Sequence, residues 1–180
     1  RLALRHPQRV KSLTLVMTSS GSRRLPGPSP RVRHAMLARP ANPLVFDSVL
    51  AHYRELYALI GSPAYPPSAE WLERRLRHSI GRAYRPQGTA RQMMAIIADG
   101  DRSPLLSRIE APTQVIHGAA DPLVPVAAGH DLARKIAGAR IDVVEGMGHD
   151  LPVPLWPRFV DGAQLLCEAI DAVRGGADRR

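Results

Sequence analysis

Two segments of this 180-residue chain share one pattern, an apolar stretch that runs directly into a glycine-containing turn. The first segment spans residues 115–125 (VIHGAADPLVP) and the second spans residues 143–152 (VVEGMGHDLP). Each turn carries one side chain suited to acid–base chemistry, Asp121 in the first and His149 in the second. A helix-like stretch separates them, and a strand, a helix and a second strand in succession predict a βαβ unit of a parallel sheet. The pattern therefore predicts that both side chains lie at strand ends.

His149 is the candidate general base, because imidazole has an unperturbed pKa of about 6.5 and can accept a proton at neutral pH. Gly146 and Gly148 flank it and let the backbone turn sharply, so that the ring can project into a cleft. Asp121 is the candidate acid, because a carboxylate that accepts the Nδ1 hydrogen orients the imidazole and stabilises the imidazolium. Either residue alone would fit an ordinary turn equally well. The ordered pair predicts the acid and the base of a hydrolytic triad.

These segments resemble the C-terminal part of an α/β-hydrolase. In that family the triad follows the order nucleophile, acid, histidine, and the nucleophile lies in a Gly-x-Ser-x-Gly elbow between a strand and a helix. That motif is absent from this sequence. Residues 2–16, with a His-Pro step and an Arg-Val pair before an apolar run, resemble the stretch that follows the elbow. The resemblance implies that the chain begins just after its own nucleophile, and Arg1 in place of Met fits a fragment.

The sequence divides into three parts. Residues 1–21 contain the expected end of the elbow helix and the following strand, residues 22–104 have helical periodicity, and residues 105–180 alternate between strand and helix patterns. Within the resemblance, the middle part is a cap that roofs the active site and sets substrate choice, although a plain helical subdomain would show the same periodicity. The expected fold class is α/β, the C-terminal portion of an α/β-hydrolase parallel sheet with an inserted helical cap.

In the middle part we expect three or four helices. Breaks are expected at residues 61–63, 66–67 and 86–88, because proline removes a backbone donor and glycine frees the backbone. The elements expected in the outer parts are strands over residues 12–18, 113–116 and 140–144, and helices over residues 126–136 and from about 155 to 173.

Composition excludes several classes of protein. With 44% apolar and 23% charged residues, the chain is an ordinary globular sequence, and it has no apolar run long enough to span a bilayer. The single cysteine, Cys167, cannot form an internal disulfide, and its apolar helical context predicts a buried, inert thiol. We therefore expect neither a membrane segment nor a disulfide framework.

The net charge of +9 invites a nucleic-acid interpretation, which the distribution of the charge does not support. Arginines are spread along the whole chain, with no dense basic run and no interleaved aromatic residues. We expect a small-molecule substrate as the partner and no nucleic acid. No pair of histidines has metal-ligand spacing, so we expect no metal and no cofactor. His117 is expected to do no more than support the site. Asp99 and Asp101 precede the penultimate strand and are expected to cap or solvate the connection there.

The expected function is that of a hydrolase, an esterase that acts on a small organic ester in the cytoplasm of a bacterium. Serine is the commoner nucleophile, and the turn at residues 146–152 resembles that of bacterial esterases. An aspartate nucleophile would use the same acid and histidine, so epoxide hydrolase and dehalogenase chemistry stay open, as does a noncatalytic binding or interaction module. The isolated chain is expected to be inactive because it lacks the nucleophile. The sequence does not indicate an oligomeric state.

Overall fold

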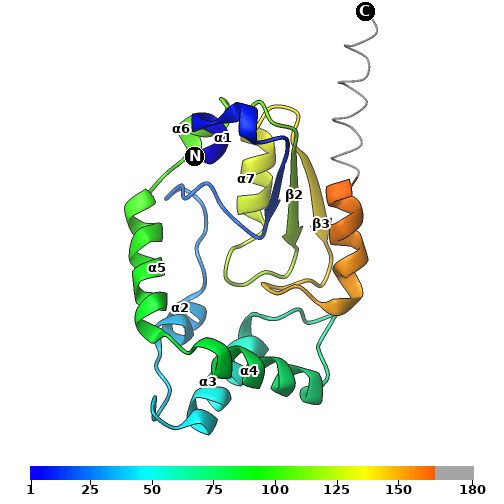
Figure 1. Ribbon diagram of the computed structural model, residues 1–180. Coiled ribbons are helices and arrows are strands. Elements are labelled where there is room, and N and C mark those ends of the chain that lie inside the picture. The colour runs from blue at the N-terminus through cyan, green and yellow to red at the C-terminus, as the bar shows by residue number, and fades with distance from the viewer. Residues whose placement is uncertain (165–180) are drawn as a thin grey trace, which may run out of the picture.

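The computed structural model describes residues 1–164, which fold around a three-stranded parallel sheet (Figure 1). The order of the strands in the sheet is β1-β2-β3, so each strand lies beside the next one in sequence. All three strands were expected from the sequence, and the parallel pairing confirms the α/β fold class. The bounds of the strands are β1, Leu13–Val16; β2, Thr113–Gly118; and β3, Arg140–Val144.

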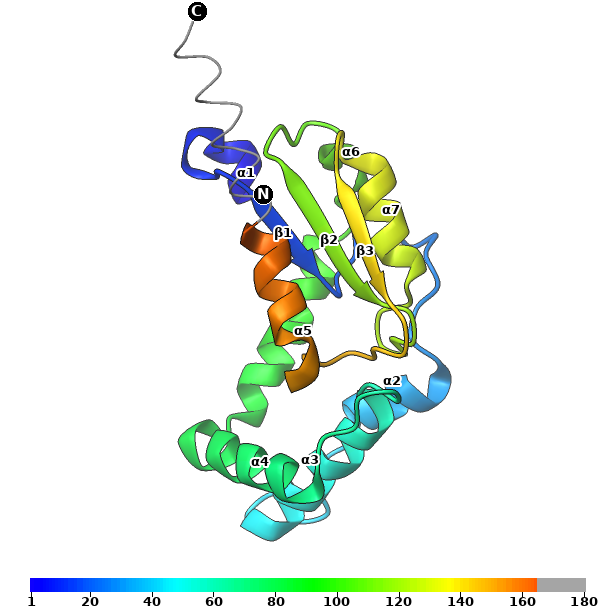
Figure 2. The same ribbon diagram turned by 90° about the vertical axis from the view of Figure 1, so that its right-hand side faces the viewer.

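Helices cover both faces of this sheet (Figures 1 and 2). Helix α7 packs against β2 and β3 on one face, and the helical residues 156–164 lie on the other. The remaining elements near the sheet are short. The bounds of the labelled helices in this part are α1, Leu2–Arg5; η1, Pro7–Arg9; α6, Ser103–Leu106; α7, Ala127–Lys135; and η2, Val153–Leu155.

The central strand β2 shows why this part folds as it does. Successive side chains of a strand point to opposite faces, so Val115 packs with Leu132 of α7 whereas Ile116 packs with Met147 and Leu155 on the other face. Val115 and Ile116 have no exposed surface. Burial of neighbouring residues on opposite faces of β2 is the pattern of a parallel strand that is covered on both sides.

A separate group of helices lies beyond the carboxyl ends of the strands, where Figures 1 and 2 show α2, α3 and α4 below the sheet with α5 returning along one side. We call residues 30–99 the helical segment. Its own small core joins Val49 and Leu50 to Leu76 and Ile80. Four helices match the expected three or four. Their bounds are α2, Pro30–Leu37; α3, Phe46–Ile60; α4, Ala69–Ala83; and α5, Pro86–Asp99.

The break expected at residues 86–88 was misplaced. The chain leaves α4 after Ala83, and α5 begins at Pro86 with Gly88 inside the helix. Proline is well tolerated in the first turn, because the donor that it lacks would have no partner within the helix. Pro86 therefore starts a helix instead of interrupting one. The last helix is observed over residues 156–164, and the rest of its expected range, with Cys167, lies outside the described residues.

The two connections between the helical segment and the sheet pass close to each other. A Cβ atom built on Gly21 would lie 2.4 Å from the carbonyl oxygen of Gly100, and both glycines have positive φ angles, 79° and 64°. Arg102 donates its backbone N–H to the carbonyl of Ser20 at 2.8 Å and its guanidinium to the carbonyl of Ser19 at 2.9 Å. We call residues 19–21 and 99–103, with the part of α7 that they contact, the hinge junction.

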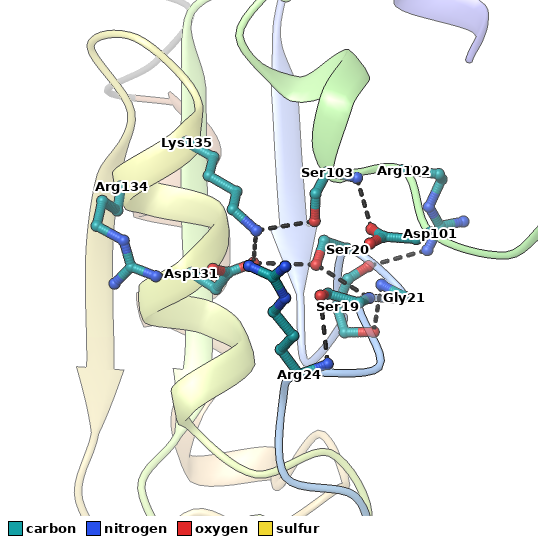
Figure 3. A network of polar contacts seen from close by, with 11 residues as sticks. Ser19, Ser20, Gly21, Arg24, Asp101, Arg102, Ser103, Asp131, Arg134 and Lys135 are labelled. Atoms are coloured by element: carbon teal, nitrogen blue, oxygen red, sulfur yellow. Dashed lines mark hydrogen bonds and ion pairs between the residues drawn. The ribbon is translucent and has the colours of Figure 1, made fainter.

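A buried carboxylate on α7 joins the two connections (Figure 3). Asp131 accepts a hydrogen bond from the Ser20 hydroxyl at 3.0 Å and forms an ion pair with Lys135 at 2.8 Å. Lys135 also donates to the hydroxyl of Ser103. Arg134 approaches the second carboxylate oxygen at 2.7 Å. Burial opposes ionisation of this group, but the hydrogen bonds from Lys135 and Ser20 and the nearby positive charges outweigh it and lower the pKa of Asp131. The hinge junction is thus stabilised mainly by charge.

Candidate active site

Asp121 and His149 lie together at the carboxyl edge of the sheet. Asp121 follows β2 and His149 follows β3, two neighbouring parallel strands whose ends meet at the same edge. The imidazole Nδ1 of His149 lies 2.7 Å from Oδ2 of Asp121. The structure therefore brings together the two residues that the sequence singled out, at hydrogen-bond distance.

The carboxylate of Asp121 is held by the backbone of its own loop. Its Oδ1 accepts the backbone N–H groups of Leu123 and Val124, at 2.9 and 2.8 Å. The side chain has no exposed surface. Because Oδ1 is already occupied, Oδ2 is directed to His149, and the loop delivers one oriented acceptor to the imidazole.

His149 combines a fixed nitrogen with partial exposure. Since a carboxylate only accepts hydrogen bonds, Nδ1 is the donor in the contact with Asp121, which makes Nε2 the basic nitrogen of a neutral ring. The side chain of His149 is 25% exposed. A partly exposed imidazole with its proton on Nδ1 can accept a proton at Nε2 and return it, as general acid–base catalysis requires.

His117 supports the loop that carries Asp121. It lies in β2 with no exposed surface, and its Nε2 donates to the carbonyl of Val124 at 2.8 Å. Its Nδ1 is buried without a hydrogen-bond partner in the described part of the chain. A Cβ atom on Gly129 would lie 2.7 Å from that nitrogen, so α7 covers the ring closely. His117 thus closes the Asp121 loop and lies 3.8 Å from its carboxylate.

The helical segment also reaches the turn that carries His149. The backbone N–H of His149 donates to the carbonyl of Ile60, the last residue of α3, at 2.7 Å. Ser62 accepts the N–H of Gly148 at 2.9 Å and donates to the carboxylate of Asp150. We call residues 60–64 and 146–150 together the histidine junction.

The roles of Ser62 and Asp150 were not expected from the sequence. Ser62 stands in the Gly-Ser-Pro stretch that was interpreted only as a helix break, and it is 3% exposed. Asp150 follows His149 directly, but its partner lies 88 residues away in the chain. A polar residue between glycine and proline that becomes buried needs a hydrogen-bond partner, yet the sequence offers no means of naming it.

The other polar residues considered from the sequence lie elsewhere. Asp99 forms ion pairs with Arg1 and Arg102, and Asp101 accepts the backbone N–H of Ser103 at 2.8 Å, so both belong to the hinge junction. Among residues 1–164, no group of three or more histidine, cysteine, aspartate or glutamate side chains is arranged to hold a metal ion. No helix in the same range is both long and apolar enough to cross a membrane.

A pocket of about 280 Å³ opens beside the histidine junction, between the helical segment and the chain that follows His149. Asp150 and Leu151 line it, although His149 itself does not. Most of the other lining side chains are aromatic residues and prolines. They include Tyr57, Tyr65, Pro66, Pro67, Trp71 and Pro152.

The sequence profile described as "alpha/beta hydrolase fold" matches residues 1–153. The chain is 30% identical over 131 residues to rhodomycin D methylesterase of Streptomyces peucetius, a match that covers 72% of this chain and 43% of that protein. It is 31% identical over 140 residues to pimeloyl-[acyl-carrier protein] methyl ester esterase of Chromobacterium violaceum, covering 76% and 52%.

Solved structures give the same fold. A meta-cleavage product hydrolase from Pseudomonas fluorescens superimposes with a TM-score of 0.62 at 17% identity, covering 97% of this chain and 59% of that one. A hydrolase from Pseudomonas aeruginosa gives 0.59 at 28% identity, covering 91% and 57%. The chain spans about half the length of the curated relatives that it matches. The profile match over most of its length shows that the chain belongs to the alpha/beta hydrolase fold family.

Proposed function

We propose that the protein is an esterase that cleaves a small organic ester through a nucleophile, Asp121 and His149. The observation that carries the proposal is the 2.7 Å contact between His149 Nδ1 and a fully buried Asp121 carboxylate at the ends of adjacent strands. The two curated relatives described above, both methyl ester esterases by name, support this class of reaction. The nucleophile in this proposal comes from residues that precede Arg1.

Both ring nitrogens of His149 take part in the proposed mechanism. His149 Nε2 removes the proton from the nucleophile hydroxyl as its oxygen attacks the ester carbonyl, and the resulting imidazolium donates that proton to the departing alcohol. Asp121 stabilises the imidazolium through Nδ1–H without becoming protonated. Water then attacks the acyl-enzyme, His149 again accepts and returns a proton, and the carboxylic acid leaves.

The open edge of the sheet supports a nucleophile upstream of Arg1. Among the described residues β1 pairs with β2 alone, and a groove of about 670 Å³ runs beside it, lined in part by Leu13 and Leu15. In the order expected for this family, the strand that precedes the nucleophile elbow would pair with that edge. Its loop would then end at the carboxyl edge of the sheet, as Asp121 and His149 do.

Residues 22–104, which include the helical segment, are proposed to be the cap of the active site, with residues 1–21 and 105–180 forming the core. Helices α2, α3 and α4 lie beyond the carboxyl ends of the strands, on the side where the Asp121–His149 pair is found (Figure 1). The pocket lined by Tyr57 and Trp71 offers an apolar, aromatic surface beside the histidine turn. We assign it to the organic part of the substrate, a small molecule. The cytoplasmic location expected from the sequence stays a prediction.

The decisive experiment uses the product of the complete reading frame that contains residues 1–180 and an activated ester as the substrate. His149→Ala and Asp121→Asn are expected to lower kcat by about a thousandfold or more. His130→Ala is the matched control, because His130 is an exposed histidine on α7. Wild-type turnover by His149→Ala would refute the proposal.

The coding sequence upstream of Arg1 decides between the remaining chemistries. A Gly-x-Ser-x-Gly motif there would support the esterase. An aspartate at the centre of the elbow would instead favour an epoxide hydrolase or a dehalogenase, in which His149 would activate water to hydrolyse the covalent intermediate. An in-frame stop codon followed by a start codon immediately before Arg1 would favour the noncatalytic binding module.

A further inference from the structure

We propose that Ser62 and Asp150 are positioning residues for His149, so that the helical segment sets the geometry of the imidazole. The inference rests on the proposed function, in which His149 is the base. It adds two residues that act through His149 and a physical link between the expected cap and the chemistry.

The side chain of Ser62 connects the two residues on either side of His149. Its hydroxyl oxygen accepts the N–H of Gly148 at 2.9 Å, and its single proton is donated to Asp150. Ser62 is 3% exposed and its bond to Gly148 is buried, so water cannot readily replace that bond. Its loss would leave the Gly148 N–H without a partner in the turn that carries His149.

The backbone of the same turn depends on the helical segment as well. The N–H of His149 donates to the carbonyl of Ile60 at 2.7 Å, and the N–H of Ala64 donates to the carbonyl of Gly146 at 3.1 Å. These bonds cross between the helical segment and the strand end, not within the sheet. A shift of residues 60–64 would therefore move the His149 backbone or leave its N–H without a partner.

Close packing leaves the histidine junction little freedom to adjust. A Cβ atom on Gly148 would lie 2.3 Å from the carbonyl oxygen of Gly61, and one on Gly146 would lie 2.3 Å from the Cβ of Ala64. The two glycines permit the approach, and the hydrogen bonds of Ser62 fix the register. The imidazole, anchored at its backbone, then meets Asp121 at 2.7 Å.

This arrangement predicts that substitutions of Ser62 or Asp150 lower kcat much more than they change KM. A base misplaced by about 1 Å can lower the rate of the chemical step about a hundredfold, while contacts to the bound substrate stay the same. In the full-length protein we expect Ser62→Ala to lower kcat about tenfold with KM within about twofold of wild type. Asp150→Ala should act in the same direction. Asp150→Asn should restore most of the activity, because its amide oxygen can still accept the Ser62 proton.

Ser20→Ala provides the matched control. Ser20 is also a buried serine that donates to a carboxylate, Asp131 at 3.0 Å, but it lies at the hinge junction. Its loss should lower the unfolding temperature without changing kcat. An equal loss of kcat in Ser20→Ala and Ser62→Ala would overturn the inference, because general loss of stability would then explain both.

A spectroscopic measurement on the full-length protein does not depend on turnover. The His149 Nδ1–H proton, hydrogen-bonded to a carboxylate, should resonate downfield of the backbone amides in ¹H–¹⁵N spectra. Ser62→Ala and Asp150→Ala should shift or broaden this resonance, whereas Asp150→Asn and Ser20→Ala should leave it unchanged. If Ser62→Ala does not fold, the two Asp150 variants decide the question.

The outcomes separate the two proposals. If His149→Ala abolishes activity while Ser62→Ala and Asp150→Ala keep wild-type kcat and an unchanged resonance, the positioning role is wrong and the proposed function stands. If His149→Ala keeps its activity, the proposed function fails. The resonance then still tests whether Ser62 orients the ring.

Discussion

The helical segment meets the sheet at two junctions, and each contains a serine hydroxyl that donates to an aspartate carboxylate. At the hinge junction a buried serine, Ser20, donates to Asp131, and at the histidine junction a buried serine, Ser62, donates to Asp150. Asp131 is also paired with Lys135 and Arg134, whereas no basic side chain of residues 1–164 lies within ion-pair distance of Asp150. The hinge junction is thus dominated by charge.

The histidine junction is dominated by backbone contacts next to the proposed base. The carbonyl of Ile60 accepts a backbone hydrogen bond from the turn at residues 146–150, and the N–H of Ala64 donates one to it. The two serine–aspartate pairs therefore differ in their neighbours, which are charged side chains at the hinge junction and the proposed base at the histidine junction. We expect changes at the histidine junction to alter turnover and changes at the hinge junction to alter stability.

Among changes at the two junctions, the largest effect is expected from Gly148→Ala. The new methyl group would lie 2.3 Å from the carbonyl oxygen of Gly61 and 2.6 Å from that of Ile60, so the backbone around His149 must move. We expect kcat of the full-length enzyme on an activated ester to fall about a hundredfold. Gly27→Ala is the control, since a Cβ atom at Gly27 meets nothing within 4 Å. Wild-type turnover by Gly148→Ala would show that the close approach of the two chains does not matter.

A second test removes the central carboxylate of the hinge junction with Asp131→Ala. Ser20 would lose its buried acceptor and Lys135 its ion pair, which should lower the free energy of unfolding by about 2 kcal/mol. Urea denaturation of the full-length protein measures this change, and its kcat should stay within about twofold of wild type. A tenfold fall in kcat would mean that the two junctions are not independent.

The pH dependence of stability tests whether the ionised Asp131 carboxylate stabilises the hinge junction. Because the pKa of Asp131 is lowered in the folded protein, its contribution to stability is fully present above the unfolded pKa of about 3.9 and is lost as the pH falls through the folded value. The difference in urea midpoint between wild type and Asp131→Asn should therefore be constant near neutral pH and shrink in acid. A difference that grew as the pH fell would contradict the assignment.

The smallest effect is expected from Arg134→Ala. The Arg134 side chain is 69% exposed, and exposed ion pairs contribute about 0.5 kcal/mol or less. Lys135→Ala should cost more, since Lys135 is 31% exposed and also donates to Ser103. Urea midpoints at low and high salt measure both variants. Equal losses would show that exposure does not govern the strength of the hinge junction.

Local patterns predicted the strands around the site because each is encoded in a few consecutive residues. The apolar runs into residues 118 and 144 predicted β2 and β3, and the turns after them predicted where Asp121 and His149 would lie. Pro86 shows the limit of such rules, because proline can either end one helix or begin the next. Only the neighbouring turns of the folded chain decide between these outcomes.

The α/β class, the strands on either side of α7 and the two residues proposed for acid–base chemistry could be predicted from the sequence, since they depend on short-range periodicity and turn chemistry. The positions of Ser62 between Gly148 and Asp150, and of Ser20 against Asp131, follow from the folded chain and from no local pattern. These partners are 86, 88 and 111 residues apart. Serine and aspartate are compatible with many surface positions, and which of them become buried together depends on how the helical segment packs on the sheet.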